Sequence, residues 1–344
     1  MIIEIERRKL MALGKSSVVV SMPKPWLNMN SLNKGDSVSL QIQPDGSLII
    51  HPTFDILDKI KDIHLLIDVN ESEDSIVRRI IASYLNGYKI IKLTSQKIFN
   101  ENQHRAIRKI TSILYMMIVE SGGSAIILQS LIDESQASVL ISIERMQIMT
   151  YSMCRDILNA LNNLDEEVVK SVLLIEDDID QLMLLLLRII RSASINPSLA
   201  NKLGLDPLDC LDYQTLVHRI ERIADHNTII ASNIIALINS GIDVPNNLKQ
   251  ILIDTAEIAF NSFDLSVNGF ISNDISQTNS IIDNEKKIIE LQKDITPVPL
   301  FVNQNNVSTL ANIIAIRESI KKIAHYAADI GELAIDRTYK SSEI

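Results

Sequence analysis

The most constraining feature of this sequence is a long stretch with helical periodicity near its middle. Within residues 166–192, apolar residues recur at alternating steps of four and three: Val168, Val172, Ile175, Ile179, Leu182, Leu186 and Ile189. This spacing places them on one side of an α-helix, as a stripe that must be buried against other helices. A second stretch repeats the pattern with Leu216, Ile220, Ile223, Ile230, Ile234 and Leu237, although Asn227 stands at one step where an apolar residue is expected. The sequence therefore predicts a helical bundle from about residue 137 onward.

Prolines divide this helical region. Pro197, Pro207 and Pro245 fall between the apolar stretches, where proline is tolerated because no helical hydrogen bond is lost. We expect six helices, three on each side of Pro245. Residues 218–231 resemble residues 318–331, which indicates a weak internal repeat. Two three-helix bundles in tandem are implied, and the periodicity also permits one continuous six-helix array.

The segments before the bundle have a different pattern. In the first 53 residues, short alternating stretches at 17–21, 37–42 and 47–50 predict β-strands, with turn signals at Gly14, at Pro23 and Pro25, and at residues 34–36 and 44–46. The next segment predicts a small α/β domain with strands at 65–67, 89–93 and 125–128 and helices at 75–85 and 103–118, ended by Gly87 and by Gly122 with Gly123. The fold class is thus multidomain and mainly α, with domains at residues 1–53, 54–136, 137–243 and 244–344.

Composition places the chain inside the cell. Cys154 and Cys210 provide neither a disulfide framework nor a zinc spacing, which is typical of the reducing cytoplasm. The first ten residues lack the pattern of a signal peptide, and the most apolar run, residues 182–190, is too short to span a bilayer. We therefore expect a cytoplasmic protein without membrane insertion.

Charge is distributed unevenly along the chain. With 33 basic and 43 acidic residues the net charge is −10, which repels nucleic acid, but the first 53 residues hold six basic residues against four acidic ones. The basic residues of this segment are Arg7, Arg8, Lys9, Lys15, Lys24 and Lys34. Two interpretations stand equally: a surface that contacts DNA phosphates, or an ordinary charged edge that prevents sheets from aggregating.

Two pairs of carboxylates are the strongest chemical signal. Glu176 and Asp180, and likewise Glu221 and Asp225, are four residues apart, so each pair shares one face of its helix beside the apolar stripe. Four such carboxylates need a cation or a proton, and their oxygen atoms favour iron, manganese, magnesium or calcium. The alternative is a solvated acidic stripe neutralised by Arg188, Arg219 and Arg222.

Enzyme classes with recognisable motifs are disfavoured. A di-iron oxidase requires Glu-x-x-His on two helices, but Ile179 and Ala224 stand three residues after Glu176 and Glu221. His218 and His226 flank the second pair and are read as solvent-facing or capped side chains sooner than as ligands. Residues 14–16 lack the earlier glycine and the following helix of a phosphate-binding loop. A metalloenzyme is accordingly the last of our hypotheses.

The N-terminal segment resembles a known family. Arg8-Lys9-Leu10, Gly14-Lys15-Ser16-Ser17, residues 20–24, Trp26, and Leu32 with Gly35-Asp36 are similar to an AbrB-type swapped-hairpin domain over about residues 4–53. The resemblance implies a fold made from two interleaved chains, hence an obligate homodimer. It further implies DNA binding through Arg7, Arg8, Lys9, Lys15 and Lys24.

The helical region resembles the PhoU family of phosphate-uptake regulators. Residues 175–182 and 220–226 carry the resemblance, which extends over about residues 137–338. It implies a multinuclear metal cluster held by Glu176, Asp180, Glu221 and Asp225, with iron as the first expectation and zinc, manganese or magnesium as alternatives. The second half departs from the family pattern, because Lys321 and His325 stand where the carboxylates of the first half would recur. There Asp283, Glu285, His325 and Asp329 are weak candidates, and Lys321 would supply charge in place of a metal.

The combination of these segments resembles archaeal phosphate-uptake regulators. It implies a non-enzymatic, DNA-binding transcriptional regulator of phosphate homeostasis with a metal-binding sensor body. The alternative is an adaptor that does not bind DNA and docks on the ATPase of the phosphate ABC transporter or on a signalling kinase. The function of residues 54–136 is left open by the sequence.

Overall fold

The computed structural model of the chain divides into two compact units, residues 1–59 and residues 60–343. The structure describes residues 6–42, 46–52, 61–241, 244–294 and 307–340.

The first unit consists of two hairpins and a short helix. Strands β1 (Met11–Leu13) and β2 (Ser17–Val19) pair antiparallel, as do β3 (Ser39–Ile42) and β4 (Leu48–His51). Helix α1 (Lys24–Met29) comes between the hairpins in the sequence. Three of the strands were predicted, but β1 and α1 were not. Pro25 is a turn signal in the sequence, yet it lies in the first turn of α1, where the fixed φ of proline suits the start of a helix.

No described residue of the first unit is buried. The apolar side chains of Leu13, Val18, Leu40, Ile42 and Leu48 are 50–76% exposed. Because isolated two-stranded hairpins are marginally stable in water, these side chains need cover from another surface.

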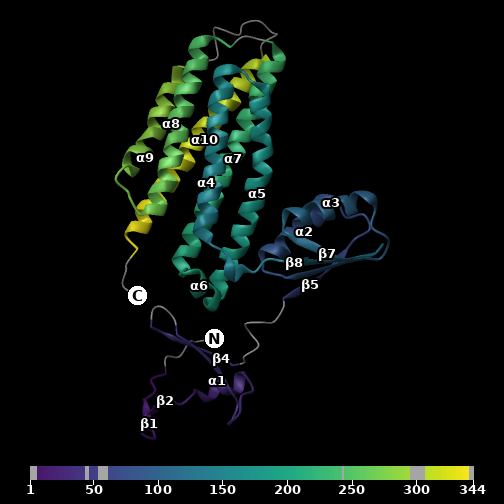
Figure 1. Ribbon diagram of the computed structural model, residues 1–344, viewed down its shortest axis with the longest axis vertical. Coiled ribbons are helices and arrows are strands. Elements are labelled where there is room, and N and C mark those ends of the chain that lie inside the picture. The colour runs from purple at the N-terminus through teal and green to yellow at the C-terminus, as the bar shows by residue number, and fades with distance from the viewer. Residues whose placement is uncertain (1–5, 43–45, 53–60, 242–243, 295–306, 341–344) are drawn as a thin grey trace. The chain divides into compact units, whose positions relative to one another are not determined.

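The second unit begins with an α/β layer. Its elements are β5 (Asp62–Ile67), α2 (Glu73–Leu85), β6 (Ile90–Ser95), α3 (Glu101–Ile113), β7 (Met116–Ser121) and β8 (Ala125–Ser130). The sheet order is β5-β6-β8-β7, with β5 parallel to β6 and the other pairs antiparallel. Helices α2 and α3 cover one face of this sheet (Figure 1), where Ile80, Ile107 and Leu93 join the buried core.

Helix α3 ends earlier than predicted. The predicted helix at 103–118 stops at Ile113, Tyr115 takes a left-handed φ of 51°, and the following apolar run forms β7 instead. A short apolar run fits a helix or a strand equally well, and pairing with β8 decides between them. Gly122 and Gly123 consequently lie between β7 and β8 and do not end a helix.

The remainder of the unit is helical, as predicted. It contains the short turn η2 (Glu134–Gln136), then α4 (Val139–Asn163), α5 (Glu166–Ile195), α6 (Pro197–Leu203), α7 (Pro207–Ser240), α8 (Asn246–Ser272), α9 (Thr278–Leu291), η3 (Gln292–Asp294) and α10 (Val307–Thr338). Three long helices precede Pro245 and three follow it. The short α6 is an addition to the prediction.

All the long helices share one hydrophobic core. The buried cluster runs from Val139 in α4 to Ala334 in α10 without a break between the two halves. Helix α10 packs along both α7 and α8, and α5 packs against α4 and α7 (Figure 1). The two helix triplets therefore form the continuous array that the periodicity also permitted. Among the described residues, these helices lack any segment long and apolar enough to cross a membrane.

A buried arginine joins the α/β layer to the helices. Arg188 of α5 is fully buried, and its Nε donates to Oε1 of Glu134 at 2.7 Å. Its Nη1 donates to the carbonyl oxygens of Tyr84 and Tyr88 at 2.6 and 3.0 Å, and the guanidinium lies 4.6 Å from the Tyr84 ring centroid. One side chain thus connects α5 to the end of α2 and to η2.

We expect Arg188→Ala to lower the free energy of unfolding by about 3–5 kcal/mol, because it leaves Glu134 and two carbonyl groups without their buried partner. Urea denaturation followed by circular dichroism measures the decrease. Arg191→Ala is the matched control: Arg191 is on the same helix but exposed, with hydrogen bonds to Leu85 and Asn86 at 3.3 Å, and should cost less than about 1 kcal/mol. Equal decreases in the two variants would contradict a special role for the buried arginine.

Candidate metal centre

The packing of α5 against α7 positions the acidic residues. Helix α5 is capped at its N-terminus by Asp165, whose side chain accepts hydrogen bonds from the backbone N–H groups of Glu167 and Val168. Helix α7 begins with a capping box between Asp206 and Asp209. Between these helices Ile179, Ile220 and Ile223 are buried, and each acidic pair lies beside one of these residues on its helix.

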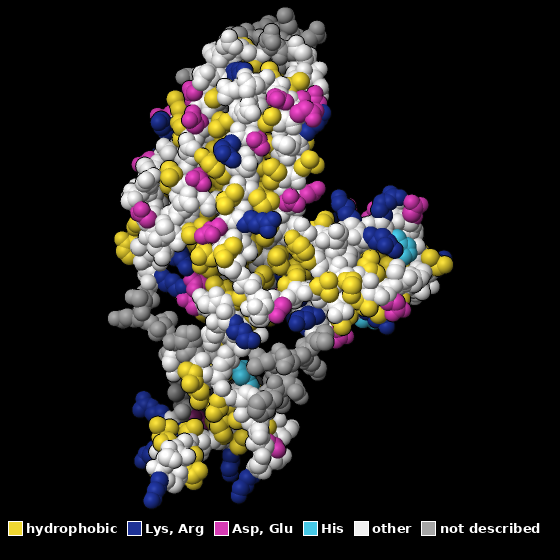
Figure 2. All heavy atoms as spheres, in the orientation of Figure 1, with side chains coloured by type: hydrophobic (Ala, Val, Ile, Leu, Met, Phe, Trp, Pro, Cys, Tyr) yellow, Lys and Arg dark blue, Asp and Glu magenta, His cyan; other side chains and the backbone are white. Residues whose placement is uncertain are grey.

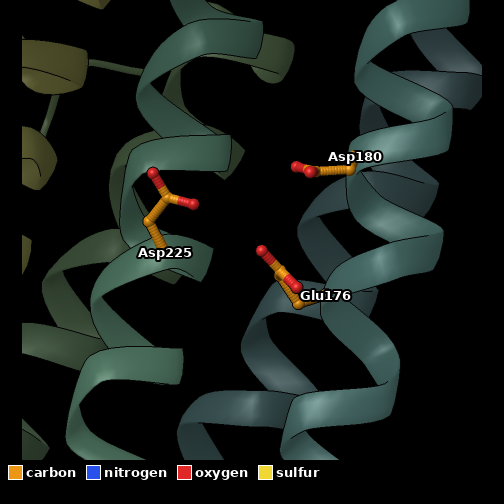
Figure 3. Close-up of side chains that lie close together, drawn as sticks. All are labelled: Glu176, Asp180 and Asp225. Atoms are coloured by element: carbon orange, nitrogen blue, oxygen red, sulfur yellow. The ribbon is translucent and has the colours of Figure 1, made fainter. Parts of the chain in front are cut away.

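Three of the four predicted carboxylates converge. Glu176 and Asp180 of α5 point towards Asp225 of α7 (Figure 3), and one oxygen atom from each lies within 4.8 Å of the others. All three side chains are half-buried. Glu221, the fourth predicted residue, is outside this group, although its side chain is only 12% exposed.

Burial and mutual repulsion make the cluster costly when all its members are ionised. Burial raises the pKa of Glu221 to about 7, reinforced by the charge of Asp225 and a hydrogen bond with it. The pKa of Glu176 is raised by burial and by Asp180, and that of Asp180 by burial and by Asp225. Half-buried oxygen donors that repel one another match the donor set of a hard divalent cation.

The surrounding side chains divide into those that reach the cluster and those that do not. Arg222 pairs with Asp225 at 3.0 Å and approaches Glu221 at 3.7 Å. Arg219 instead pairs with Asp329 of α10 at 3.0 Å, and Arg188 pairs with Glu134 at 2.7 Å. Of the three counter-ions considered from the sequence, Arg222 alone contacts these carboxylates within the described residues.

The two histidines that flank the second pair lie outside the cluster. Burial lowers the pKa of both His218 and His226. The His226 ring is 5.9 Å from that of Tyr326 on α10, and its buried Nδ1 has no hydrogen-bond partner in the described part of the chain.

The second half holds a histidine beside two carboxylates where the sequence pattern of the first half would place acidic residues. His325 Nδ1 lies 3.1 Å from Glu285 of α9, and Nε2 lies 3.9 Å from Asp329. In the described residues, these three side chains do not bring three ligand atoms as close together as the first half does. Asp283 is exposed beside Lys286, and Lys321 pairs with Glu318 on its own helix at 3.0 Å. The basic side chain that contacts Glu285 is thus His325, and not Lys321.

The predicted DNA-contacting side chains are exposed on the first unit. Arg7, Lys9, Lys15 and Lys24 are all exposed, with Lys15 in the turn between β1 and β2. Arg8 forms an ion pair with Glu6. Figure 2 shows Lys and Arg side chains standing out from this unit.

Two arginine roles escaped the sequence interpretation. Arg188 and Arg219 were grouped with Arg222 as counter-ions of the acidic stripe, yet Arg188 pairs with Glu134 and Arg219 pairs with Asp329 of α10. One signal was available: Arg188 lies within the apolar run 182–190, so its neighbours on the helix are buried.

The raised pKa of Glu221 predicts a pH dependence for the metal-free protein. A carboxyl group with a higher pKa in the folded state stabilises the fold at low pH and loses this contribution as the pH rises. For Glu221 the loss falls between about pH 4.5 and 7. The lowered pKa values of His218 and His226 act in the opposite direction below pH 6.5, so the comparison with Glu221→Gln is the informative one.

Urea midpoints in EDTA between pH 4.5 and 8 test this expectation. The wild-type midpoint should fall relative to that of Glu221→Gln as the pH rises. Parallel curves for the two proteins would show that Glu221 titrates normally.

Two parts of the chain match known protein families. Residues 143–234 match the PhoU domain; they span most of α4, all of α5 and α6 and most of α7, and include all four carboxylates. Residues 12–53 match the family described as antidote-toxin recognition MazE, bacterial antitoxin, and include both hairpins except Met11. No curated protein matches the chain. One segment of the first unit is therefore similar to the MazE family, and a segment of the helical body is similar to the PhoU domain.

Proposed function

We propose that this chain is a DNA-binding regulator of phosphate homeostasis whose helical body holds a metal ion. PhoU domains belong to phosphate-uptake regulation, MazE/AbrB-like domains bind DNA, and both families are regulatory and not enzymatic. The observation that carries the metal part is the convergence of Glu176, Asp180 and Asp225 within the PhoU-matched segment.

The metal would be held by these three carboxylates, and Glu221, which is hydrogen-bonded to Asp225, would lie beside it. A divalent cation supplies the positive charge that half-buried carboxylates need, and hard oxygen donors favour iron, manganese or magnesium. The role of the protein residues is to hold α5 and α7 together through this shared ligation. No chemical step is required of a regulator.

Elemental analysis of the purified protein tests the metal proposal. We expect at least one metal ion per chain, absent from Asp180→Asn/Asp225→Asn, because two of the three convergent oxygen donors lose their charge. Asp178→Asn is the matched control, since Asp178 lies on the same helix but is exposed to solvent. A folded wild-type protein that cannot be loaded with Fe²⁺, Mn²⁺, Zn²⁺ or Mg²⁺ would contradict the proposal.

The proposal of DNA binding is based on the side chains of the first unit. Its basic side chains are exposed, and the uncovered apolar residues of its hairpins support assembly with a second copy into a homodimer. A dimer would present two sets of Arg7, Arg8, Lys9, Lys15 and Lys24 to one duplex, and phosphate neutralisation by such residues accounts for most non-specific affinity.

Arg7→Ala/Arg8→Ala should weaken binding to labelled duplex DNA and reduce the slope of log K against log salt by about one for each phosphate that the variant no longer neutralises. Fluorescence anisotropy across a salt series measures both. The control Arg145→Ala/Arg155→Ala removes equal charge from exposed positions on α4. An equal change in both variants would point to net charge and not to a DNA surface.

The adaptor function is favoured by a different observation. Ile141 and Ile148 lie seven residues apart on α4, so they share one face, and they are 64% and 68% exposed. Such a face suits a partner protein, for which a transporter ATPase or a signalling kinase is the candidate. A protein that forms dimers but does not bind DNA at low salt would support this adaptor function.

A further inference from the structure

Arg222 reaches the carboxylate cluster from the solvent side. Its Nη1 lies 3.0 Å from Oδ2 of Asp225, and its Nε lies 3.7 Å from Oε2 of Glu221. The Arg222 side chain is 56% exposed, whereas those of Glu221 and Asp225 are 12% and 29% exposed. The guanidinium therefore covers two deeper carboxylates and remains free to turn outward.

The charge of Arg222 opposes the repulsion within the cluster. It lowers the pKa of Asp180 and of Glu221, against the stronger effects of burial and of neighbouring carboxylates. Arg219 does not share this task, because it pairs with Asp329 and lies 5.4 Å from the Tyr326 ring centroid. In the described part of the chain, Arg222 is thus the cation that contacts the cluster directly.

A divalent cation and Arg222 require the same oxygen atoms. Asp225 belongs to the group of three convergent carboxylates and is also the partner of Arg222. A guanidinium bound to that carboxylate repels an incoming cation and occupies an acceptor position. Moving this half-exposed side chain into water costs little, because exposed ion pairs are individually weak.

We propose that Arg222 is the built-in counter-cation of the metal-free site and competes with the metal for Asp225. This inference rests on the proposed metal function. Arg222 keeps the acidic cluster tolerable without metal and weakens metal affinity, so the site exchanges its ion and can report the availability of the metal. Metal binding releases Arg222 to the surface of α7.

Titration with Mn²⁺ alone, followed by isothermal calorimetry, tests this competition in the full chain stripped with EDTA. Arg222→Ala should bind Mn²⁺ about three- to tenfold more tightly, the size expected for removing one or two half-exposed ion pairs. The same variant should have a lower urea midpoint when metal-free. Arg222→Lys retains the charge but not the forked geometry, and should fall between the two proteins.

Arg219→Ala is the control, since it removes the same charge from the same helix at a position facing α10. Its Mn²⁺ affinity should stay within about twofold of wild type, because charge effects from outside the site are screened by salt. Unchanged or weaker binding by Arg222→Ala, beside a wild-type protein that binds Mn²⁺, overturns the inference and leaves the metal function standing. Binding by the variant alone would show that Arg222 excludes the metal from the wild-type site, which overturns both the metal function and the exchangeable site. Binding by neither protein overturns both.

Discussion

The shared burial of apolar helix faces is the interaction on which the rest of this structure depends. The stripes of α4, α5, α7, α8 and α10 meet in one core, so the first helix triplet cannot pack independently of the second. The acidic pairs occupy the border of this core. Once the isoleucines beside them are buried, Glu176, Asp180 and Asp225 must lie close together even though their charges repel.

The repulsion between carboxylates at the border of the core is offset by different side chains in the two halves. In the first half Arg222 pairs with Asp225, the pKa of Glu221 is raised by burial, and the donor set suits a hard cation. In the second half His325 lies between Glu285 and Asp329. The PhoU match also lies in the first half. The two helix triplets therefore share one core and differ in the charged side chains at its border.

The first unit and the helical body differ in how much of their apolar surface they bury. The helices bury a continuous core within one chain, whereas the hairpins leave Leu13, Leu40 and Ile42 exposed and carry the basic side chains. A segment of about 50 residues with two hairpins is too small to cover its own apolar surface. This supports the proposed assembly of two copies through the first unit.

The sequence alone determined the helical body, the positions of α5 and α7, and the placing of each acidic pair on one helical face, because helical periodicity is a local property. Tertiary structure decided the rest. It selected Asp225 over Glu221 as the partner of Glu176 and Asp180, since the rotation of α7 about its axis is set by packing along its whole length. It assigned Arg188 to the α/β layer, because the buried partners of this side chain lie far away in the sequence. It also turned residues 116–121 into β7, because a short apolar run fits a helix or a strand and pairing with the adjacent β8 decides between them.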